Sequence, residues 1–258
     1  MSEYNESKLL YRIYLKTLEN GYSDLDTYLK RVSTDNDALQ ELRENLTFVS
    51  SHFFRGFIWP LLRDQCGAAF AMRDNIKVWC AGCSSGKEVY SVLMMLKEAL
   101  PGVTIELLAT DYNQEMLRQC SEGVYSLRTI EEIPMKYWHF TEKYHSINTI
   151  KSDFSHLFQF RFVPELRGLV QTRHLNLLTD DYPCGFDLIL CRNVIKFFGE
   201  DSKRAVQEKL ARSLVRDGFL VVSDELEKEG INNPEGLGLK QVRNSCIYLK
   251  SDYRESYD

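Results

Sequence analysis

Apolar residues recur at helical spacing through the first part of the chain. The spacing i, i+3, i+4, i+8, which predicts one buried helix face, is followed by Leu10, Ile13, Tyr14 and Leu18. Three further helical patterns follow over residues 23–32, 35–46 and 53–65. No pattern typical of a strand occurs before residue 70. Residues 1–70 are therefore predicted to form a small, all-helical N-terminal domain.

The pattern changes at Asn75. A short apolar strand is predicted over 76–81, and it runs into a glycine-containing loop and then a long amphipathic helix that ends at Pro101. A second apolar strand over 104–109 is followed by Asp111, and a second helix is predicted over 114–120. Strand, glycine loop, helix, strand and acid, in this order, are typical of the front half of a doubly wound α/β sheet.

The rest of the chain continues this α/β pattern. Residues 186–191 and 219–223 predict buried strands, a helix is predicted between them over 201–214, and residues 245–250 predict a last strand. Two short strand patterns, 158–163 and 169–174, flank Pro164 and predict a hairpin inserted into the main fold. The expected second domain spans 71–258, with this small β subdomain at about 150–175.

Composition narrows the class of protein. The 32 basic and 37 acidic residues give a net charge of −5, which does not favour nucleic acid as a partner. No apolar run is long enough to insert into a membrane, and the N-terminus lacks the pattern of a signal peptide, so we expect a cytoplasmic protein. The seven cysteines are scattered and expected to be reduced. Cys80 and Cys83 form a lone C-x-x-C without further ligands, so no metal site is predicted.

Three loops fall at predicted carboxyl ends of strands, where doubly wound sheets bind ligands: 81–88, 111–113 and 191–197. Gly82 and Gly86 allow close approach of a ligand to the backbone, and a carboxylate such as Asp111 accepts hydrogen bonds from ribose hydroxyls. Together they predict a cofactor that contains adenosine. The loop lacks both the full G-x-G-x-x-G spacing and the lysine of an NTP-binding loop. On motifs alone, S-adenosylmethionine and a dinucleotide remain equal alternatives.

Several motifs, in the same order, resemble the family of chemotaxis receptor methyltransferases (CheR-type, protein-glutamate O-methyltransferases), from about residue 25 to 250. The matching segments are 50–55 (SSHFFR), 78–91 (VWCAGCSSGKEVYS), 110–111 (TD), 176–178 (NLL), 186–198 (FDLILCRNVIKFF) and 217–219 (DGF). The resemblance implies a Rossmann-like doubly wound methyltransferase sheet, a small N-terminal helical domain and a small β insertion. It also implies S-adenosylmethionine as cofactor and S-adenosylhomocysteine as product.

The resemblance further assigns site residues. Ser51 and Arg55 would lie over the cofactor and the substrate carboxylate, and both count among the cofactor-binding residues. Asp111 would hold the ribose, and Asn193 and Val194 would lie near the transferred methyl group.

Five more residues complete the implied cofactor site. Ala81, Gly82 and Glu88 would line the amino-acid portion of the cofactor. Asn176 and Leu177 would flank the adenine.

The activity implied is methyl transfer to glutamate carboxylates of a chemotaxis-type receptor or a related signalling protein. A glutamate with a solution pKa of about 4.3 is already ionised at neutral pH, so the reaction needs no general base. Alignment is the remaining task, and the planar guanidinium of Arg55, the expected catalytic residue, suits a carboxylate. A basic stripe, Lys8, Arg12 and Lys16, is a candidate contact for the receptor and equally well a solvated helix face.

The chain also departs from the family pattern. Phe197 stands where family members usually have tyrosine, Lys87 stands in a loop that usually reads GEEPYS, and residues 223–226 (SDEL) replace the usual GHSE. Compared with the family, the N-terminal domain is expected to lack the first helix. These departures favour an alternative, in which the protein is a catalytically weak regulatory module that binds adenosylmethionine or adenosylhomocysteine and acts through a protein partner. A nicotinamide-dependent oxidoreductase is the third hypothesis.

Overall fold

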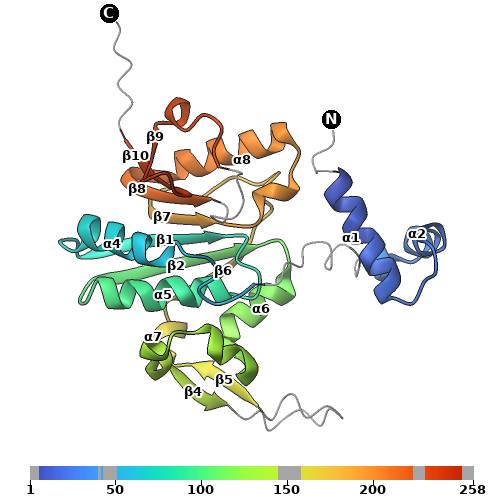
Figure 1. The fold of residues 1–258 in the computed structure, drawn as a ribbon, viewed down its shortest axis with the longest axis horizontal. Helices are drawn as coiled ribbons and strands as arrows, with labels where there is room; N and C mark the ends of the chain where they lie inside the picture. Colours follow the sequence, from blue (N-terminus) through green and yellow to red (C-terminus); the bar gives the residue numbers. More distant parts are fainter. Residues whose placement is uncertain (1–5, 40–41, 43–50, 145–157, 223–229, 252–258) are drawn as a thin grey trace, which may run out of the picture.

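The computed structural model describes residues 6–39, 42, 51–144, 158–222 and 230–251, without the side chains of residues 6–9 and 12. Its centre is a seven-stranded sheet in the order β6-β2-β1-β7-β8-β10-β9 (Figure 1). The strands are β1 (Asn75–Ala81), β2 (Thr104–Asp111), β6 (Val170–His174), β7 (Phe186–Cys191), β8 (Leu214–Val222), β9 (Leu239–Gln241) and β10 (Ile247–Lys250). The pairs from β6 to β8 are parallel, and β10 runs antiparallel to both of its neighbours. The predicted doubly wound α/β fold is confirmed.

The strand order contains a topological switch point. From β1 the chain moves outward through β2 to β6, and then returns to the other side of β1 to form β7 and β8. The connections that follow β1 and β7 therefore leave in opposite directions, and this edge is where doubly wound sheets bind ligands. The loops after β1, β2 and β7, which the sequence singled out, lie at this edge.

Alternate side chains along each central strand pack into two separate cores, one on each face of the sheet. On β1, Ile76 and Val78 belong to a core with the helices α4 (Trp59–Phe70) and α5 (Lys87–Ala99). Trp79, the next residue along, belongs to a core with the helix α8 (Glu200–Ser213). Because both faces are covered, most residues of the central strands are apolar, as is typical of parallel sheets. The helix α6 (Gln114–Glu122) follows β2, as predicted.

A second, three-stranded antiparallel sheet lies beside α5 and α6 (Figure 1). It consists of β3 (Val124–Ser126), β4 (Thr141–Tyr144) and β5 (Gln159–Phe162), and between β3 and β4 lie the 3-10 helices η1 (Leu127–Glu132) and η2 (Met135–Phe140). The remaining short elements are α7 (Pro164–Arg167), η4 (Ile195–Phe197) and η5 (Glu235–Leu237). We call the residues from β3 to β5 that the structure describes the inserted unit.

A small β unit is inserted, as predicted, but the strands that form it are not those of the predicted hairpin. β5 pairs with β3 and β4, whereas β6, its expected hairpin partner, pairs in parallel with β2 in the main sheet. The physical reason is the connection: α7 is a closed helical turn, in which the backbone N–H of Gly168 donates to the carbonyl of Pro164 (2.8 Å). A helical turn does not join strands as a tight hairpin loop does. Residues 135–144 form η2 followed directly by β4.

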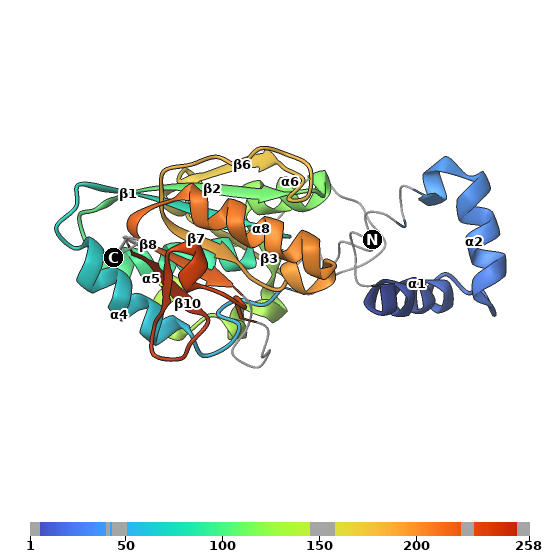
Figure 2. The same ribbon diagram turned by 90° about the horizontal axis from the view of Figure 1, so that it is seen from above.

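The helices α1 (Glu6–Glu19) and α2 (Leu25–Thr34) lie next to each other (Figure 2) and share a small core of Tyr28, Val32, Ala38 and Leu42. Helix α2 begins after Asp24, whose side chain accepts a hydrogen bond from the backbone of Thr27, as an N-cap does. The buried face predicted for α1 is wrong, because three of its four residues are exposed: Leu10, Tyr14 and Leu18. In the described part of α1, the fourth predicted residue, Ile13, packs against the small core.

The fourth predicted helix begins later than expected, at Trp59 instead of residue 53. Residues 51–58 form a loop, and α4 belongs to the main core together with α5. Whether residues 1–70 fold as one domain stays a prediction. Half of the third predicted helix, and residues 223–226, lie outside the described residues. None of the helices in the described ranges is long and apolar enough to span a membrane.

Candidate active site at the carboxyl edge of the sheet

The glycine loop after β1 is tied to the end of β2 and touches the loop after β7. The backbone N–H groups of Gly82 and Cys83 donate to the carbonyl of Thr110, at 2.8 and 2.9 Å. Gly82 has a φ of +74°, and a Cβ placed there would lie 2.4 Å from Cγ2 of Val194. Only glycine permits this conformation and this contact without strain. The fold thus brings Ala81 and Gly82 next to Val194.

Gly86, at the N-terminus of α5, is fixed by a second close contact. Its φ is +87°, and a Cβ there would lie 2.5 Å from Sγ and 2.9 Å from Cα of Cys120. We expect Gly86→Ala to lower the free energy of unfolding by roughly 2–3 kcal/mol, through backbone strain and overpacking. Gly102, with a φ of +93° and nothing within 4 Å, is the matched control, and Gly102→Ala should cost only about 1 kcal/mol. Urea denaturation measures both, and equal losses would contradict the packing argument.

Asp111 lies half-buried at the end of β2. Its carboxylate accepts hydrogen bonds from the backbone N–H groups of Ser84 (2.8 Å) and Asn113 (2.9 Å). Burial raises the pKa of Asp111, and these backbone hydrogen bonds partly oppose the rise. Each carboxylate oxygen has two lone pairs, so acceptor capacity remains for a ligand hydroxyl. This is the environment expected of an acid that binds a ribose.

The segment after β6 is held beside Asp111. The backbone N–H of Leu175 donates to the carbonyl of Asp111 (3.1 Å). The side-chain oxygen of Asn176 then accepts from the N–H of Leu178 (3.0 Å), and the carbonyl of Leu177 accepts from the hydroxyl of Tyr182 (2.6 Å). Asn176 and Leu177 therefore stand at a fixed turn next to Asp111, the acid expected to bind the ribose. An adenine attached to that ribose would lie on this side.

Arg192 is the residue that the sequence analysis missed. Its side chain is fully buried, and it donates to Glu88 (2.7 Å) and to the backbone carbonyl of Arg55 (2.9 Å). A second donor, the indole N–H of Trp59, also reaches the Arg55 carbonyl (3.1 Å). Arg192 thus connects the helix after the glycine loop to the loop that carries Arg55. It lies within the segment 186–198 that carries the resemblance, which was the available signal.

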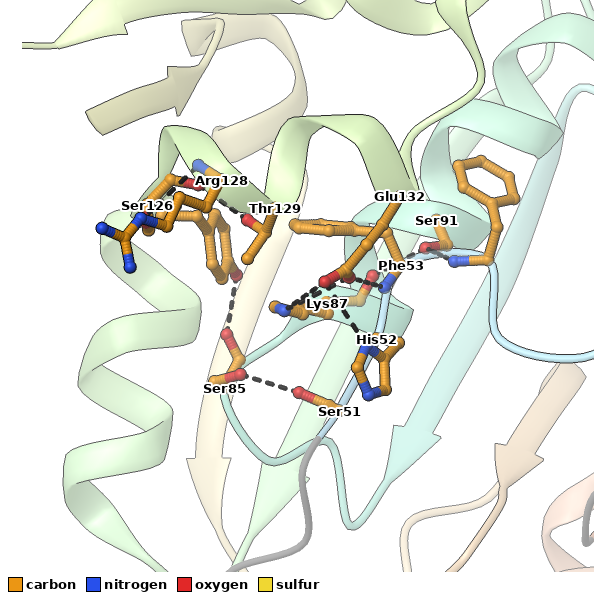
Figure 3. A network of polar contacts seen from close by, with 12 residues as sticks. Ser51, His52, Phe53, Ser85, Lys87, Ser91, Ser126, Arg128, Thr129 and Glu132 are labelled. Carbon is orange, nitrogen blue, oxygen red and sulfur yellow. Dashed lines mark hydrogen bonds and ion pairs between the residues drawn. The ribbon is translucent and has the colours of Figure 1, made fainter. Parts of the chain in front are cut away.

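The loop 51–58 crosses the same edge of the sheet (Figure 3). The hydroxyl groups of Ser51 and Ser85 are hydrogen-bonded at 2.9 Å, so Ser51 touches the glycine loop. The backbone N–H of Phe53 donates to Glu132 (2.8 Å), and that of Phe54 donates to the hydroxyl of Ser91 (2.9 Å). Phe54 has a φ of +48°. Such a backbone persists only where its surroundings fix it.

The loop after β7 carries the remaining predicted residues. Asn193 adopts a φ of +60°, which asparagine tolerates better than most residues, and its side-chain oxygen accepts from Lys196 (3.4 Å). Phe197 is half-buried in η4, and the ammonium of Lys196 lies 5.5 Å from the centre of its ring. Every predicted site residue is thus found on one of the loops or element ends at this edge.

Redox or metal chemistry at the C-x-x-C motif finds no support. Burial raises the pKa of the Cys80 thiol, and a hydrogen bond with Cys120 together with burial raises the pKa of the Cys83 thiol. Because the thiolate is the reactive form, these raised pKa values favour the unreactive, protonated thiols. No cluster of three or more potential metal ligands occurs among the residues that the structure describes.

Fold and site together define an α/β protein whose switch-point edge suits an adenosine-containing cofactor. The close backbone approach at Gly82 and the acceptor Asp111 fit such a group. A family model described as "CheR methyltransferase, SAM binding domain" matches residues 47–234. The chain therefore belongs to the CheR methyltransferase family, and it is an S-adenosylmethionine-dependent methyltransferase. This removes the dinucleotide alternative and the oxidoreductase hypothesis.

Relatives at about 30% identity agree with this assignment. A chemotaxis protein methyltransferase of Listeria monocytogenes is 31% identical over 251 residues, which cover 96% of this chain and 90% of that protein. Another, of Borreliella burgdorferi, is 29% identical over 245 residues, covering 89% and 82%. Among solved structures, the mitomycin 7-O-methyltransferase MmcR has a TM-score of 0.41 and 11% identity, covering 93% of this chain and 67% of that one.

Proposed function

We propose that this protein methylates glutamate carboxylates of a chemotaxis-type receptor. The observation that carries the proposal is the chain of contacts from Glu88 through the buried Arg192 to Arg55. Glu88 supplies a carboxylate suited to the ammonium of the cofactor's amino-acid portion, and Arg55 supplies a guanidinium suited to the carboxylate of the acceptor. The chain of contacts joins these two residues. The names of the relatives, chemotaxis protein methyltransferases, support a receptor as the substrate.

Each site residue has a proposed role in holding the cofactor. Ala81, Gly82 and Glu88 line its amino-acid portion, since they lie at the glycine loop and the start of α5. Asp111 accepts from the ribose hydroxyls. The adenine is flanked by Asn176 and Leu177, next to Asp111 along the edge of the sheet. These cofactor-binding roles rest on the family resemblance together with the contacts described above.

The remaining residues handle the reacting end. Ser51 and Arg55 lie over the site, and Asn193 and Val194 lie where the glycine loop and the loop after β7 touch. When bound, S-adenosylmethionine supplies a sulfonium methyl group as electrophile. The acceptor glutamate is ionised at neutral pH, so the protein has to align it and exclude water. Arg55 grips the carboxylate, and its backbone is fixed by Arg192 and Trp59.

A second candidate function rests on Phe197. If the reaction needs a hydroxyl at this position, the protein is a weak catalyst that binds adenosylmethionine or adenosylhomocysteine and acts through a protein partner. The pocket residues Asp111, Glu88 and Gly82 are retained in this case too. Turnover on receptor glutamates therefore distinguishes the two functions, whereas cofactor binding does not.

The proposed place of action is the cytoplasm, and no disulfide joins cysteines in the described parts of the chain. The partner is a receptor or signalling protein that bears acceptor glutamates. The basic stripe of α1 stays a candidate contact: Lys16 forms an ion pair with Glu19, while the side chains of Lys8 and Arg12 lie outside the described residues.

Two measurements test the proposal. Calorimetric titration with S-adenosylhomocysteine, with NAD as the control ligand, should give micromolar binding for the former alone. Transfer of labelled methyl groups to the cytoplasmic fragment of a chemotaxis receptor should then label glutamates, and a fragment with Glu→Gln at the acceptor positions should stay unlabelled. Binding without transfer would favour the regulatory module over the enzyme.

A further inference from the structure

Helix α5 is bridged to the inserted unit by a lysine–glutamate pair at each end. At its N-terminal end, Lys87 lies 3.2 and 3.3 Å from the two carboxylate oxygens of Glu132, at the end of η1. Near its C-terminal end, Glu98 lies 2.6 Å from Lys136 of η2, and also accepts from the hydroxyl of Tyr137. The two bridges join the same two parts of the fold, so they invite comparison.

The first bridge contacts the backbone of the site loop through Glu132 (Figure 3), whereas the second contacts the loop only through the ring of Tyr137, which stacks on Phe54 among the described residues. Glu132 accepts the backbone N–H of Phe53 (2.8 Å), and Nδ1 of His52 lies 3.3 Å from the same carboxylate. The ammonium of Lys87 lies 5.3 Å from the centre of the Phe53 ring, within the range of a cation–π contact. One carboxylate therefore gathers donors from helix α5 and from the loop 51–58.

The Phe53 ring completes this attachment. It is almost fully buried, and its centre lies 5.0 Å from that of Tyr125 and 5.7 Å from that of Phe162. Both partners belong to the inserted unit. Phe53 is thus anchored by its ring and by its N–H, both times to the inserted unit. The proposed site residues Ser51 and Arg55 stand two positions to either side of this anchor.

We infer that Lys87 and Glu132 are positioning residues, which hold the loop 51–58 over the cofactor site by fixing the backbone at Phe53. This inference rests on the proposed function, in which Ser51 and Arg55 act at that site. It also explains the unusual Lys87, a cation at a helix N-terminus, where cations are disfavoured. Glu132 supplies the compensating carboxylate, and the pair is partly shielded, with 13% and 25% of the two side chains exposed.

Three variants separate positioning from general stability. Lys87→Met removes the charge and keeps most of the side-chain length, and Glu132→Gln removes the charge and keeps an oxygen for Phe53. Lys136→Met removes the ion pair of the second bridge but leaves in place the hydrogen bond from Tyr137 to Glu98 and the stacking of Tyr137 on Phe54, so it serves as the matched control. All are compared at a temperature at which circular dichroism shows each variant to be folded.

The first readout is hydrogen exchange in the peptide spanning residues 51–58, which needs no cofactor. Lys87→Met and Glu132→Gln should raise exchange there by about tenfold, because loss of a charge-assisted contact of 1–2 kcal/mol changes the opening equilibrium by that order. Lys136→Met should leave this peptide unchanged. Unchanged exchange in the first two variants, or an equal rise in all three, would overturn the inference.

The second readout is the Kd for S-adenosylhomocysteine. Because the loop covers the proposed cofactor site, the first two variants should weaken binding by about tenfold, and the double variant should be no weaker than the worse single one, since both act through one contact. Faster exchange with unchanged affinity would also overturn the positioning role. If the unaltered protein fails to bind S-adenosylhomocysteine, the proposed function is contradicted. The hydrogen-exchange result still tests whether Lys87 and Glu132 hold the loop.

Discussion

Phe197→Tyr should raise the rate of methyl transfer by about tenfold to several hundredfold, the range expected when one aligned hydrogen-bond donor is restored to a reacting centre. Phe197 is half-buried in η4, directly after the loop of Asn193 and Val194 that touches the glycine loop. A phenol at this position has the same ring and only one additional oxygen, so the backbone need not move. The rate is measured in single turnovers with saturating labelled S-adenosylmethionine and a receptor fragment.

Two controls make this result interpretable. The Kd for S-adenosylhomocysteine should change little in Phe197→Tyr, because the expected gain belongs to the transition state and not to ground-state binding. Phe197→Leu should not raise the rate, since it changes the packing without adding a hydroxyl. A flat rate in Phe197→Tyr, with binding intact, would show that this position does not limit turnover.

Asp111→Ala should weaken binding of S-adenosylhomocysteine by roughly 1–3 kcal/mol, because the ribose hydroxyls lose a charged acceptor. The same carboxylate accepts from Ser84 and Asn113, so the variant also removes two hydrogen bonds that shape the site. Calorimetry gives the affinity, and urea denaturation gives the accompanying loss of stability.

The matched control for this variant is Asp187→Asn. Asp187 is a buried aspartate of β7 whose carboxylate accepts from the backbone N–H of Lys77 (2.8 Å) and pairs with Arg73, away from the switch-point edge. Its substitution should lower stability and leave affinity for S-adenosylhomocysteine unchanged. Unaltered affinity in Asp111→Ala would contradict the ribose role.

The same affinity should depend on pH through Asp111. Burial raises the pKa of this carboxyl above the usual value of 3.8, so it becomes protonated at a higher pH than an exposed aspartate. Since ribose hydroxyls need the ionised acceptor, affinity should be full above the raised pKa and fall as the pH drops through it. Stability responds with the opposite sign: the folded state binds the proton more tightly than the unfolded chain, so protonation in this window favours folding. Calorimetry across pH checks the affinity, and a pH-independent Kd would contradict the acceptor role.

Local patterns were enough to predict the central frame of this protein. The strand β7 was predicted over 186–191 and spans those residues in the structure, because a parallel strand buried on both faces is apolar at nearly every position; its one polar residue, Asp187, is paired with Arg73. The loop after β1 and Asp111 were also found in advance, since a glycine with positive φ and an acid at a strand end are properties of single residues and their neighbours. The family resemblance, once stated, added the loop of Ser51 and Arg55.

Only the tertiary structure decided which distant residues meet. Arg192 and Glu88 are 104 positions apart, and Glu132 and Phe53 are 79 apart, so no local period or spacing links them. The assignment of β6 to the main sheet, and the exposure of Leu10 on α1, likewise depend on which surface each segment meets after the chain has folded. The sequence determines the elements and the chemistry at their ends through short-range backbone and burial preferences. The partners of the charged side chains follow from packing, because a charge is satisfied by whatever group the fold brings within reach.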